Sequence, residues 1–353
     1  MTSSSKQRSV NTPESTAMFR EAAEAATAVE RQIRDNASLL ASLTQELRER
    51  APRFVMTSAR GSSDHAATFA KYVIETQLGL VTASAAPSVT SIYAAAQSLD
   101  DVLFLAISQS GKSPDLMEHS RAARAAGAHV VALVNTADSP LADVAHRVIP
   151  LQAGPERSVA ATKSFICTLS AILHLAAAWR NDRALLDAVA ALPEGLRKAW
   201  DMDWTAAVEA LASARNLFVI GRGLGLAAAQ EAALKFKETC GLHAEAFSAA
   251  EVKHGPMTLV GADFPVLCLA QEDETLSGIM SLAREFRERG ARVLVATPVA
   301  EEPARLPIPA AGHFACTPIL AIQSFYRMVN ALAIRRGRNP DLPPHLRKVT
   351  ETM

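Results

Sequence analysis

Short runs of apolar residues alternate along most of this chain with longer stretches in which apolar residues recur every three or four positions. The runs VLFLAIS, from residue 102, and HVVALVN, from residue 129, are apolar almost throughout, which is typical of strands covered on both faces. The stretches between such runs are roughly 15 residues long and predict helices. Because strands and helices alternate, we predict an α/β fold with parallel strands and right-handed crossovers.

The chain also contains an internal repeat. Residues 55–75 (VMTSARGSSDHAATFAKYVIE) match residues 217–237 (LFVIGRGLGLAAAQEAALKFK) at an offset of 162. The same offset places the apolar run that starts at Asp101 on the run that starts at Asp263. A third pair of segments, GAHVVALVNT and GARVLVATP, matches one residue later in register. Three matches at nearly one offset predict two tandem doubly wound parallel-sheet domains that arose by internal duplication.

The repeat and its flanking segments divide the chain into six parts. They are a disordered N-terminus (residues 1–15), N-terminal helices (16–50), a first domain (51–180), a helical linker (181–204), a second domain (205–335) and an extended C-terminal tail (336–353). The tail is predicted to be extended because it contains three prolines. With 353 residues, the chain is long enough for two domains of ordinary size.

Composition narrows the classes of partner. Lys and Arg total 36, as do Asp and Glu, so the chain lacks the basic excess that a nucleic-acid-binding surface needs. No apolar run reaches 18 residues and no secretory signal is apparent, so we expect no membrane contact. The four cysteines lie far apart without metal-binding spacing, which is typical of buried thiols in a reducing compartment. These features favour a soluble, cytoplasmic protein.

Residues 231–256, EAALKFKETCGLHAEAFSAAEVKHGP, carry the densest set of reactive side chains. Glu231, Lys235 and Glu238 are spaced by four and three, so they share one face of a helix. A second group follows directly and consists of His243, Glu245, Glu251, Lys253 and His254. Carboxylates, amines and imidazoles at such short range are what general acid–base catalysis requires. A solvated salt-bridge face would show the same spacing, so both interpretations stay open.

Hydroxyl-rich turns follow the strands of the first repeat, at the sheet edge where open α/β sheets bind ligands. The turns are Ser58 to Ser63, SQSGKSP from Ser108, and PERSVAATKS from Pro155. Ser113 is a good helix N-cap followed by proline, and a helix start with free N–H groups favours anions. Each turn alone could simply cap a helix, but three of them indicate a phosphate or sugar-phosphate site.

The second repeat differs at the corresponding turns. Where the first repeat has SQSGKS the second has AQEDET, whose carboxylates repel phosphate. Its GRGLG turn is not the GxGxxG of dinucleotide sites, and no GxxxxGK[ST] phosphate loop occurs. We therefore predict that the first domain binds the anion and that the second supplies the Glu, Lys and His side chains.

Four motifs together resemble the SIS (sugar isomerase) family, and within it the isomerase domain of glucosamine-6-phosphate synthases. SQSGKS is similar to the family's phosphate loop and ERSVAATKSF to its sugar-lining segment. Residues 231–256 are similar to the signature around the catalytic glutamate and histidine. LRKVTE, near the C-terminus, resembles the loop that carries a sugar-binding lysine. The resemblance covers nearly all of the chain beyond residue 16 and implies two tandem SIS domains.

The resemblance implies which residues bind an amino-sugar phosphate. Its phosphate and nearby hydroxyls would be held by Ser62, Ser63, Ser108, Gln109, Ser110 and Ser113. Val159 and Ala161 would line the sugar. Lys348 would contact the open-chain sugar or form a Schiff base with its carbonyl carbon. No cofactor is implied, and no metal.

The resemblance also implies which residues carry out the chemistry. Glu238 would move a proton between C1 and C2 of the sugar, with Lys235 and Glu231 beside it. His254 would help to open the sugar ring. In the family this histidine reaches in from the neighbouring subunit, so we expect a homodimer with a shared active site.

Departures from the synthase pattern bear on the direction of the reaction. The synthases carry an N-terminal glutaminase domain with a cysteine directly after Met1, whereas here Thr2 follows Met1 and no such domain is apparent. Ala161 stands where the synthases usually have serine, and Arg60 and Arg347 also differ. We therefore expect the releasing direction, in which glucosamine 6-phosphate and water give fructose 6-phosphate and ammonia.

Three other functions stay open at this point. One is a deglycase or isomerase that acts on another amino-sugar or ketosamine phosphate. Another is an aminating isomerase that uses free ammonia or a partner glutaminase. The third is a non-catalytic SIS module that senses sugar phosphates, although such a module has no need for the Glu, Lys and His set.

Overall fold

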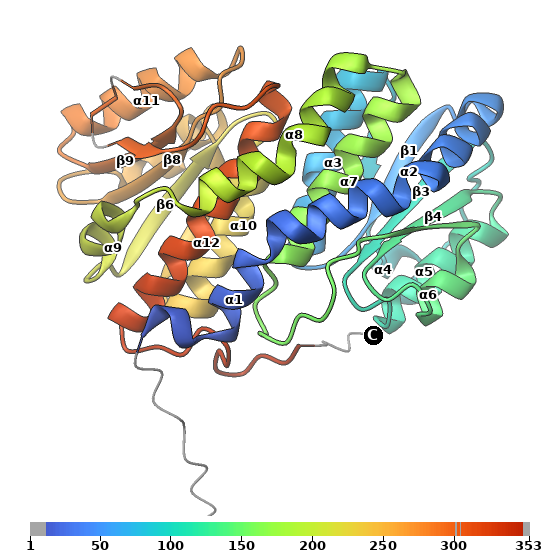
Figure 1. Ribbon diagram of the computed structural model, residues 1–353, viewed down its shortest axis with the longest axis horizontal. Coiled ribbons are helices and arrows are strands. Elements are labelled where there is room, and N and C mark those ends of the chain that lie inside the picture. Colours follow the sequence, from blue (N-terminus) through green and yellow to red (C-terminus); the bar gives the residue numbers. More distant parts are fainter. Residues whose placement is uncertain (1–11, 301, 304, 349–353) are drawn as a thin grey trace, which may run out of the picture.

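Two five-stranded parallel sheets, one in each half of the chain, form the framework of the fold (Figure 1). The computed structural model describes residues 12–300, 302–303 and 305–348. The first sheet, of order β2-β1-β3-β4-β5, contains β1 (Phe54–Ser58), β2 (Thr82–Ser84), β3 (Val102–Ser108), β4 (His129–Val134) and β5 (Arg147–Pro150). The second, of order β10-β9-β8-β6-β7, contains β6 (Asn216–Gly221), β7 (His243–Ser248), β8 (Pro265–Leu269), β9 (Arg292–Thr297) and β10 (Arg305–Pro307). Counted from β7 to β10, the second sheet has the order β7-β6-β8-β9-β10, which is the strand order of the first sheet.

The two sheets are assembled from matching parts of the sequence repeat. The starts of β1 and β6 are 162 residues apart, and those of β4 and β9 are 163 apart. Strands β3 and β4 are buried along their whole length, as their continuous apolar sequences predict. All strand pairs are parallel. The predicted α/β fold with two tandem doubly wound sheets is therefore confirmed.

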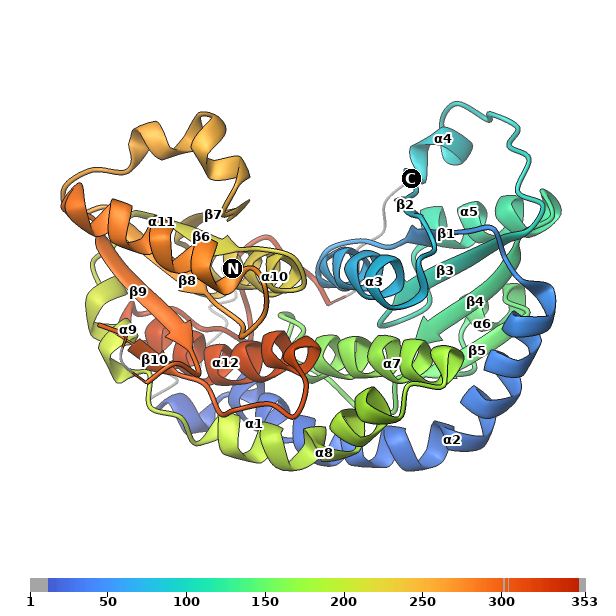
Figure 2. The same ribbon diagram turned by 90° about the horizontal axis from the view of Figure 1, so that it is seen from above.

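Helices cover both faces of each sheet. In the first half they are α3 (Ser62–Leu78), α4 (Ser88–Ser91), α5 (Pro114–Ala125), α6 (Pro140–Val144) and α7 (Lys163–Arg180). In the second half they are α9 (Thr205–Leu211), α10 (Gly225–Cys240), α11 (Leu276–Glu288) and α12 (Thr317–Arg335), with short 3-10 helices η2 (Glu251–His254), η3 (Pro256–Leu259) and η4 (Phe314–Cys316). Helices α3 and α10 lie side by side between the two sheets (Figure 2), which brings the two halves into contact.

Three further helices join the halves on their outer side. They are α1 (Ala17–Ala23), α2 (Ala25–Arg50) and α8 (Arg183–Trp200), which run beneath α7 and α12 in Figure 2. Of the N-terminus that we expected to be disordered, residues 1–11 lie outside the described residues. Residues Pro13–Ser15 form a 3-10 turn, η1, and the amide of Asn330 donates a 2.9 Å hydrogen bond to the carbonyl of Pro13.

The tail after α12 returns from the second half of the molecule to the first. Between residues 336 and 348 it has turns but no helix or strand. The carboxylate of Asp341 accepts hydrogen bonds from the backbone N–H groups of Ala17 and Met18, each at 2.7 Å, at the start of α1. The N–H of Val159 donates to the carbonyl of Asp341 at 3.3 Å. The tail is therefore fixed against both the N-terminal helices and the first domain before it reaches Lys348.

All four cysteines are free and buried, as their spacing predicted. Burial raises the pKa of each thiol, Cys167, Cys240, Cys268 and Cys316, to about 12. These thiols are therefore protonated and unreactive near neutral pH. In the part of the chain that the structure describes, no helix combines the length and the apolar character needed to cross a bilayer.

Candidate active site

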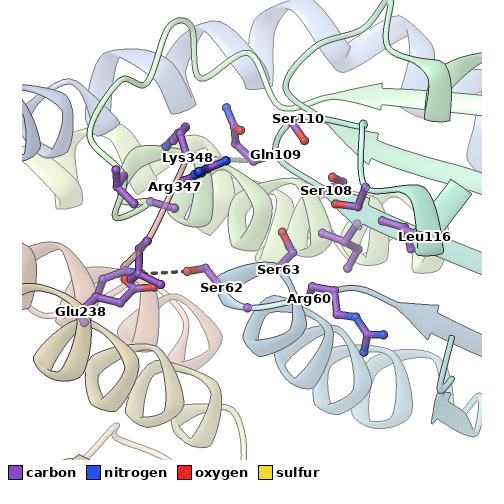
Figure 3. A pocket seen from close by; sticks show the side chains of 17 residues that line it. Arg60, Ser62, Ser63, Ser108, Gln109, Ser110, Leu116, Glu238, Arg347 and Lys348 are labelled. Atoms are coloured by element: carbon purple, nitrogen blue, oxygen red, sulfur yellow. Dashed lines mark hydrogen bonds and ion pairs between the residues drawn. The ribbon is translucent and has the colours of Figure 1, made fainter. Parts of the chain in front are cut away.

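A cavity of about 300 Å³ lies at the carboxyl ends of the strands of the first sheet, where helix α10 of the second half meets it (Figure 3). Two strand-end turns of the first half, the segment before α7, helix α10 and the tail all contribute side chains. The lining residues are Arg60, Gly61, Ser62, Ser63, Ile107, Ser108, Gln109, Ser110, Ser113, Leu116, Val159, Ala161, Lys235, Glu238, Leu346, Arg347 and Lys348. Eleven of the thirteen residues to which the family resemblance assigns a role thus meet in one place, all except Glu231 and His254.

The turn after β3 is shaped as an anion cradle. The hydroxyl oxygen of Ser108, the last residue of β3, accepts a 3.0 Å hydrogen bond from the N–H of Gly111. Gly111 has a φ of +64°, and a Cβ atom there would lie 2.1 Å from the hydroxyl of Ser139, so the turn requires glycine. Ser113 is the N-cap residue of α5, and its hydroxyl makes no capping bond. Pro114 has no N–H, and the N–H of Leu116 donates to the carboxylate of Asp115 at 2.8 Å, so of the first three residues of α5 Asp115 alone keeps an N–H available to an anion in the cavity.

The third hydroxyl-rich turn differs from the expectation. Only Val159 and Ala161 of this segment line the cavity, and its hydroxyls do not. The N–H groups of Thr162 and Ser164 donate to the carboxylate of Glu156 at 3.0 and 3.1 Å, so they are not free for an anion. The segment therefore supplies an apolar wall, and two of the three turns remain as the anion cradle.

Arg60, which the sequence places in the turn after the first strand and which departs from the family pattern, also lines the cavity. Its guanidinium is 2.9 Å from the carboxylate of Asp115, which is 1% exposed. Figure 3 shows its guanidinium turned away from Ser108 and Ser110. Its position two residues after the end of β1 agrees with the expectation that strand ends carry the site in open α/β sheets.

Glu231, Lys235 and Glu238 form a continuous ion-pair ladder along one face of α10. The Nζ of Lys235 lies 3.2 Å from Glu231 and 2.6 Å from Glu238. Glu231 and Lys235 are fully buried, which excludes the solvated salt-bridge face that the spacing left open. Burial works to lower the pKa of Lys235, but the two carboxylates raise it, so its side chain is an ammonium.

Glu231 lies behind Lys235 and outside the cavity lining. Its carboxylate accepts hydrogen bonds from the hydroxyls of Ser62 at 3.2 Å and Tyr326 at 3.0 Å, and it is 3.0 Å from Nδ1 of His65. Although burial works to raise the pKa of Glu231, the Lys235 ammonium and His65 hold it below its usual value. Glu231 is therefore a buried anion that joins α3, α10 and α12 and fixes the position of Lys235.

Lys348 reaches the cavity from the tail. Its Nζ lies 2.9 Å from the carboxylate of Glu156, whose side chain is fully buried. Glu156 precedes α7 and was not among the residues that the sequence singled out. Nothing local in the sequence marks it, since its partner is 192 residues away.

The second charged group of the sequence is not brought to this cavity. His254 ends the short helix η2 and is exposed, and it is not among the lining residues. Lys253 pairs with Glu285 on α11 at 2.8 Å, while His243 and Glu245 lie on the edge strand β7. Of the charged side chains in residues 231–256, therefore, Lys235 and Glu238 are the ones that line the cavity within one chain.

A second cavity, of about 340 Å³, adjoins the first. The two share Glu238 and Leu346. The other residues around the second cavity belong to the end of α10 and to the tail and are Lys237, Thr239, Gly241, Gly337, Arg338, Asn339, Leu342 and Pro344. Glu238 is thus reached from two sides.

In the second domain, the turn that corresponds to the one after β3 is occupied by a carboxylate of the protein itself. Asp273 stands at the repeat position of Gly111, and its carboxylate accepts from the N–H of Thr275 at 2.8 Å and from the amide of Gln271 at 3.0 Å. A Cβ atom on Gly225 would lie 2.3 Å from Oε1 of Gln271, so the GRGLG turn is also filled by a side chain. Over residues 12–348, with 301 and 304 left aside, no three His, Cys, Asp or Glu side chains are grouped for a metal ion.

Comparison with known proteins agrees with this arrangement. A model of the SIS domain family matches residues 50–178 and 210–335. The glutamine–fructose-6-phosphate aminotransferase (isomerizing) of Symbiobacterium thermophilum is 36% identical over 321 residues, which are 85% of this chain and 52% of that protein. The chain spans about half the length of the curated relatives that it matches.

Two solved structures show the same fold. A candidate phosphosugar isomerase from Silicibacter pomeroyi DSS-3 has a TM-score of 0.87 and 45% identity, and the match covers 92% of this chain and all of that one. The C-terminal domain of the glucosamine-fructose-6-phosphate aminotransferase from Francisella tularensis has a TM-score of 0.83 and 25% identity, over 93% and 98% of the two chains.

Proposed function

The chain belongs to the SIS domain family, and on this premise we propose that it is an enzyme that releases ammonia from glucosamine 6-phosphate and yields fructose 6-phosphate. The observation that carries the proposal is the shared cavity in which Glu238 and the Lys235 ammonium face a turn shaped for an anion. In Figure 3 Ser108 and Ser110 lie away from Glu238, while Ser62 lies beside it. A sugar phosphate bound by its phosphate at the serines would present its other end to Glu238.

The proposed chemistry is a proton transfer followed by hydrolysis. In the open-chain amino sugar, Glu238 removes the proton from C2 and returns it to C1, while a second proton passes from the C2 nitrogen to the C1 oxygen, so that the C2–N bond becomes an imine and C1 becomes an alcohol. The Lys235 ammonium stabilises the negative charge that develops on the oxygen during this transfer. Water then adds to C2, ammonia leaves, and the C2 ketone of fructose 6-phosphate remains.

The second cavity supports the hydrolytic direction. Hydrolysis of the imine needs water at C2, which would lie beside Glu238. Since Glu238 and Leu346 border both cavities, water in the second cavity would lie close to the reacting end of the sugar. An aminating reaction would instead be favoured by a site closed to water, because water competes with ammonia for the carbonyl carbon.

The proposal includes a second copy of the chain. Ring opening needs a proton donor and acceptor near the ring oxygen, and we propose His254 for this role. In a single chain His254 is exposed and outside the cavity, so it would act in the cavity of a neighbouring subunit. A homodimer with two shared sites satisfies this requirement.

The first experiment is to incubate the purified protein with glucosamine 6-phosphate, without added metal, and to measure ammonia and fructose 6-phosphate. Release of both in equal amounts supports the proposal. Binding without release would favour a sugar-phosphate sensor. If the protein neither binds nor converts glucosamine 6-phosphate, the proposal is wrong, and ketosamine phosphates become the next substrates to test.

A further inference from the structure

Both lysines that reach the cavity have a fully buried carboxylate behind them. Glu231 lies behind Lys235, and Glu156 lies behind Lys348 at 2.9 Å. The two pairs come from different parts of the chain, since Lys235 is on helix α10 and Lys348 is on the tail. The pairing on α10 follows from helical spacing, whereas the pairing on the tail has no local cause. Glu156 therefore calls for an explanation of its own.

Glu156 is held rigidly from the side of the first domain. Besides the N–H groups of Thr162 and Ser164, the hydroxyl of Ser164 donates to its carboxylate at 2.7 Å. These donors lie at the start of α7, an 18-residue helix whose N-terminal end favours a negative charge. Burial works to raise the pKa of Glu156, but Lys348 and these donors hold it below its usual value. The carboxylate is thus a fixed negative charge.

Lys348, by contrast, has little else to hold it. The tail is anchored seven residues earlier, where the carboxylate of Asp341 caps α1. Between Asp341 and Lys348 the only hydrogen bonds recorded in the described part of the chain join backbone groups within the tail. A lysine side chain at the end of such a segment has high rotational freedom. The contact with Glu156 is the one that determines where its amine lies.

We propose that Glu156 is a positioning residue that holds the amine of Lys348 at the cavity and thereby keeps the tail in place over the sugar. The inference rests on the proposed function in one respect, that Lys348 contacts the open-chain sugar. Glu156 itself lines no part of the cavity and acts only through Lys348. Its removal should leave Lys348 present but no longer aimed at the substrate.

A double-mutant cycle tests this dependence. Glu156→Gln keeps the size of the side chain and removes its charge, and we expect it to lower kcat by about tenfold with KM changed by less than about threefold. In a chain that already carries Lys348→Met, adding Glu156→Gln should lower kcat by less than about twofold, because the residue through which it acts is gone. If the fold reductions in kcat caused by the two substitutions instead multiply in the double variant, Glu156 has only a structural role and the proposal is overturned.

Glu21→Gln is the matched control. The Glu21 carboxylate is also buried and accepts from the N–H groups of Arg157 and Ser158 in the same segment, but it does not contact Lys348. The fold reduction in kcat caused by Glu21→Gln should be the same in the native chain and in the chain that carries Lys348→Met. If Glu156→Gln does not fold, Glu156→Asp replaces it. The shorter side chain keeps the charge at the start of α7 and reaches less far towards Lys348.

A second measurement does not depend on turnover. Trace acetylation with acetic anhydride, followed by mass spectrometry, reports how available each amine is. Relative to the exposed Lys237, we expect Lys348 to react slowly in the native chain and about tenfold faster in Glu156→Gln, because an ion-paired ammonium does not attack the reagent. Equal reactivity in both chains would overturn the inference. Protection of Lys348 in a protein that converts no amino sugar would reject the proposed function and leave the positioning role intact.

Discussion

The Nζ of Lys235 lies 2.6 Å from the carboxylate of Glu238, one helical turn further along α10, while its other side faces the fully buried Glu231. The lysine is thus fixed between an inner carboxylate that substrate cannot reach and an outer one that lines the cavity. The inner pair immobilises the ammonium, and the ammonium in turn orients Glu238. Such preorganised charge needs little rearrangement when a proton is transferred.

Replacing Glu238 by glutamine should abolish turnover while substrate binding persists. We expect kcat for glucosamine 6-phosphate to fall on the order of a thousandfold, because the amide cannot accept the C2 proton. Binding of the sugar phosphate, measured by calorimetry, should change little, since the phosphate cradle is unaltered. Glu245→Gln, at an exposed position on β7, is the control and should retain full activity. Comparable rates for both variants would exclude Glu238 as the base.

Hybrid dimers should recover activity that neither parent has. Chains carrying Glu238→Gln and chains carrying His254→Ala are each expected to be inactive. After mixing and reassembly, roughly a quarter of the native activity should return, because each heterodimer contains one site with both residues intact. Absence of any recovery, with heterodimers demonstrated by mass spectrometry, would mean that His254 does not act across an interface.

The phosphate cradle should respond to loss of a single hydroxyl. Ser108→Ala removes the acceptor for the N–H of Gly111, so the turn after β3 should lose its shape. We expect KM for glucosamine 6-phosphate to rise by about tenfold, since a hydrogen bond to a charged group contributes about 1.5 kcal/mol. Ser98→Ala, on an exposed loop, is the control and should leave KM unchanged. An unaltered KM in Ser108→Ala would place the phosphate elsewhere.

Removing Asp273 should open an anion site in the second domain. Its carboxylate bonds to the N–H and hydroxyl of Thr275 and to the amide of Gln271, where the first domain has a free cradle. Asp273→Gly should lower the stability by about 1 kcal/mol, because these hydrogen bonds are lost. Phosphate should then raise the melting temperature of the variant more than that of the native chain. Asp273→Asn, which keeps the shape, should not gain this response.

The stability of the first domain should depend on pH through His129. Burial, with the nearby Arg50, lowers the pKa of His129 to about 4, whereas Glu46, 3.5 Å from its Nε2, works in the opposite direction. The unfolded chain therefore binds a proton between pH 6.5 and pH 4 that the folded chain does not, so stability is lost as pH falls through this range.

His129→Leu should remove this dependence. Between pH 7 and pH 5 the native chain should lose about 2 kcal/mol more than the variant, measured by thermal or urea unfolding. His243→Leu, at an exposed position on β7, is the control and should behave like the native chain. If the free energy of unfolding changes with pH in the same way in the native chain and in His129→Leu, the prediction is wrong.

The sequence by itself determined the features that depend on neighbours along the chain. Apolar runs such as that of β3 predicted strands buried on both faces, and the repeat at an offset of 162 predicted two sheets of one design. The spacing of Glu231, Lys235 and Glu238 predicted the ladder on α10, because helical geometry alone places them on one face. The position of Ser108 to Ser113 directly after a predicted strand indicated that they lie at the ligand-binding edge, since the carboxyl ends of parallel strands share one edge of the sheet.

Only the tertiary structure decided which of these groups are buried and which distant groups meet. It buried Glu231 and Lys235, left His254 on the surface, and turned the hydroxyls after Pro155 away from the cavity. It also placed Glu156 against Lys348, 192 residues away. Local periodicity cannot show such pairs, because they depend on how the two domains and the tail pack together, and packing is set by the whole surface of each element.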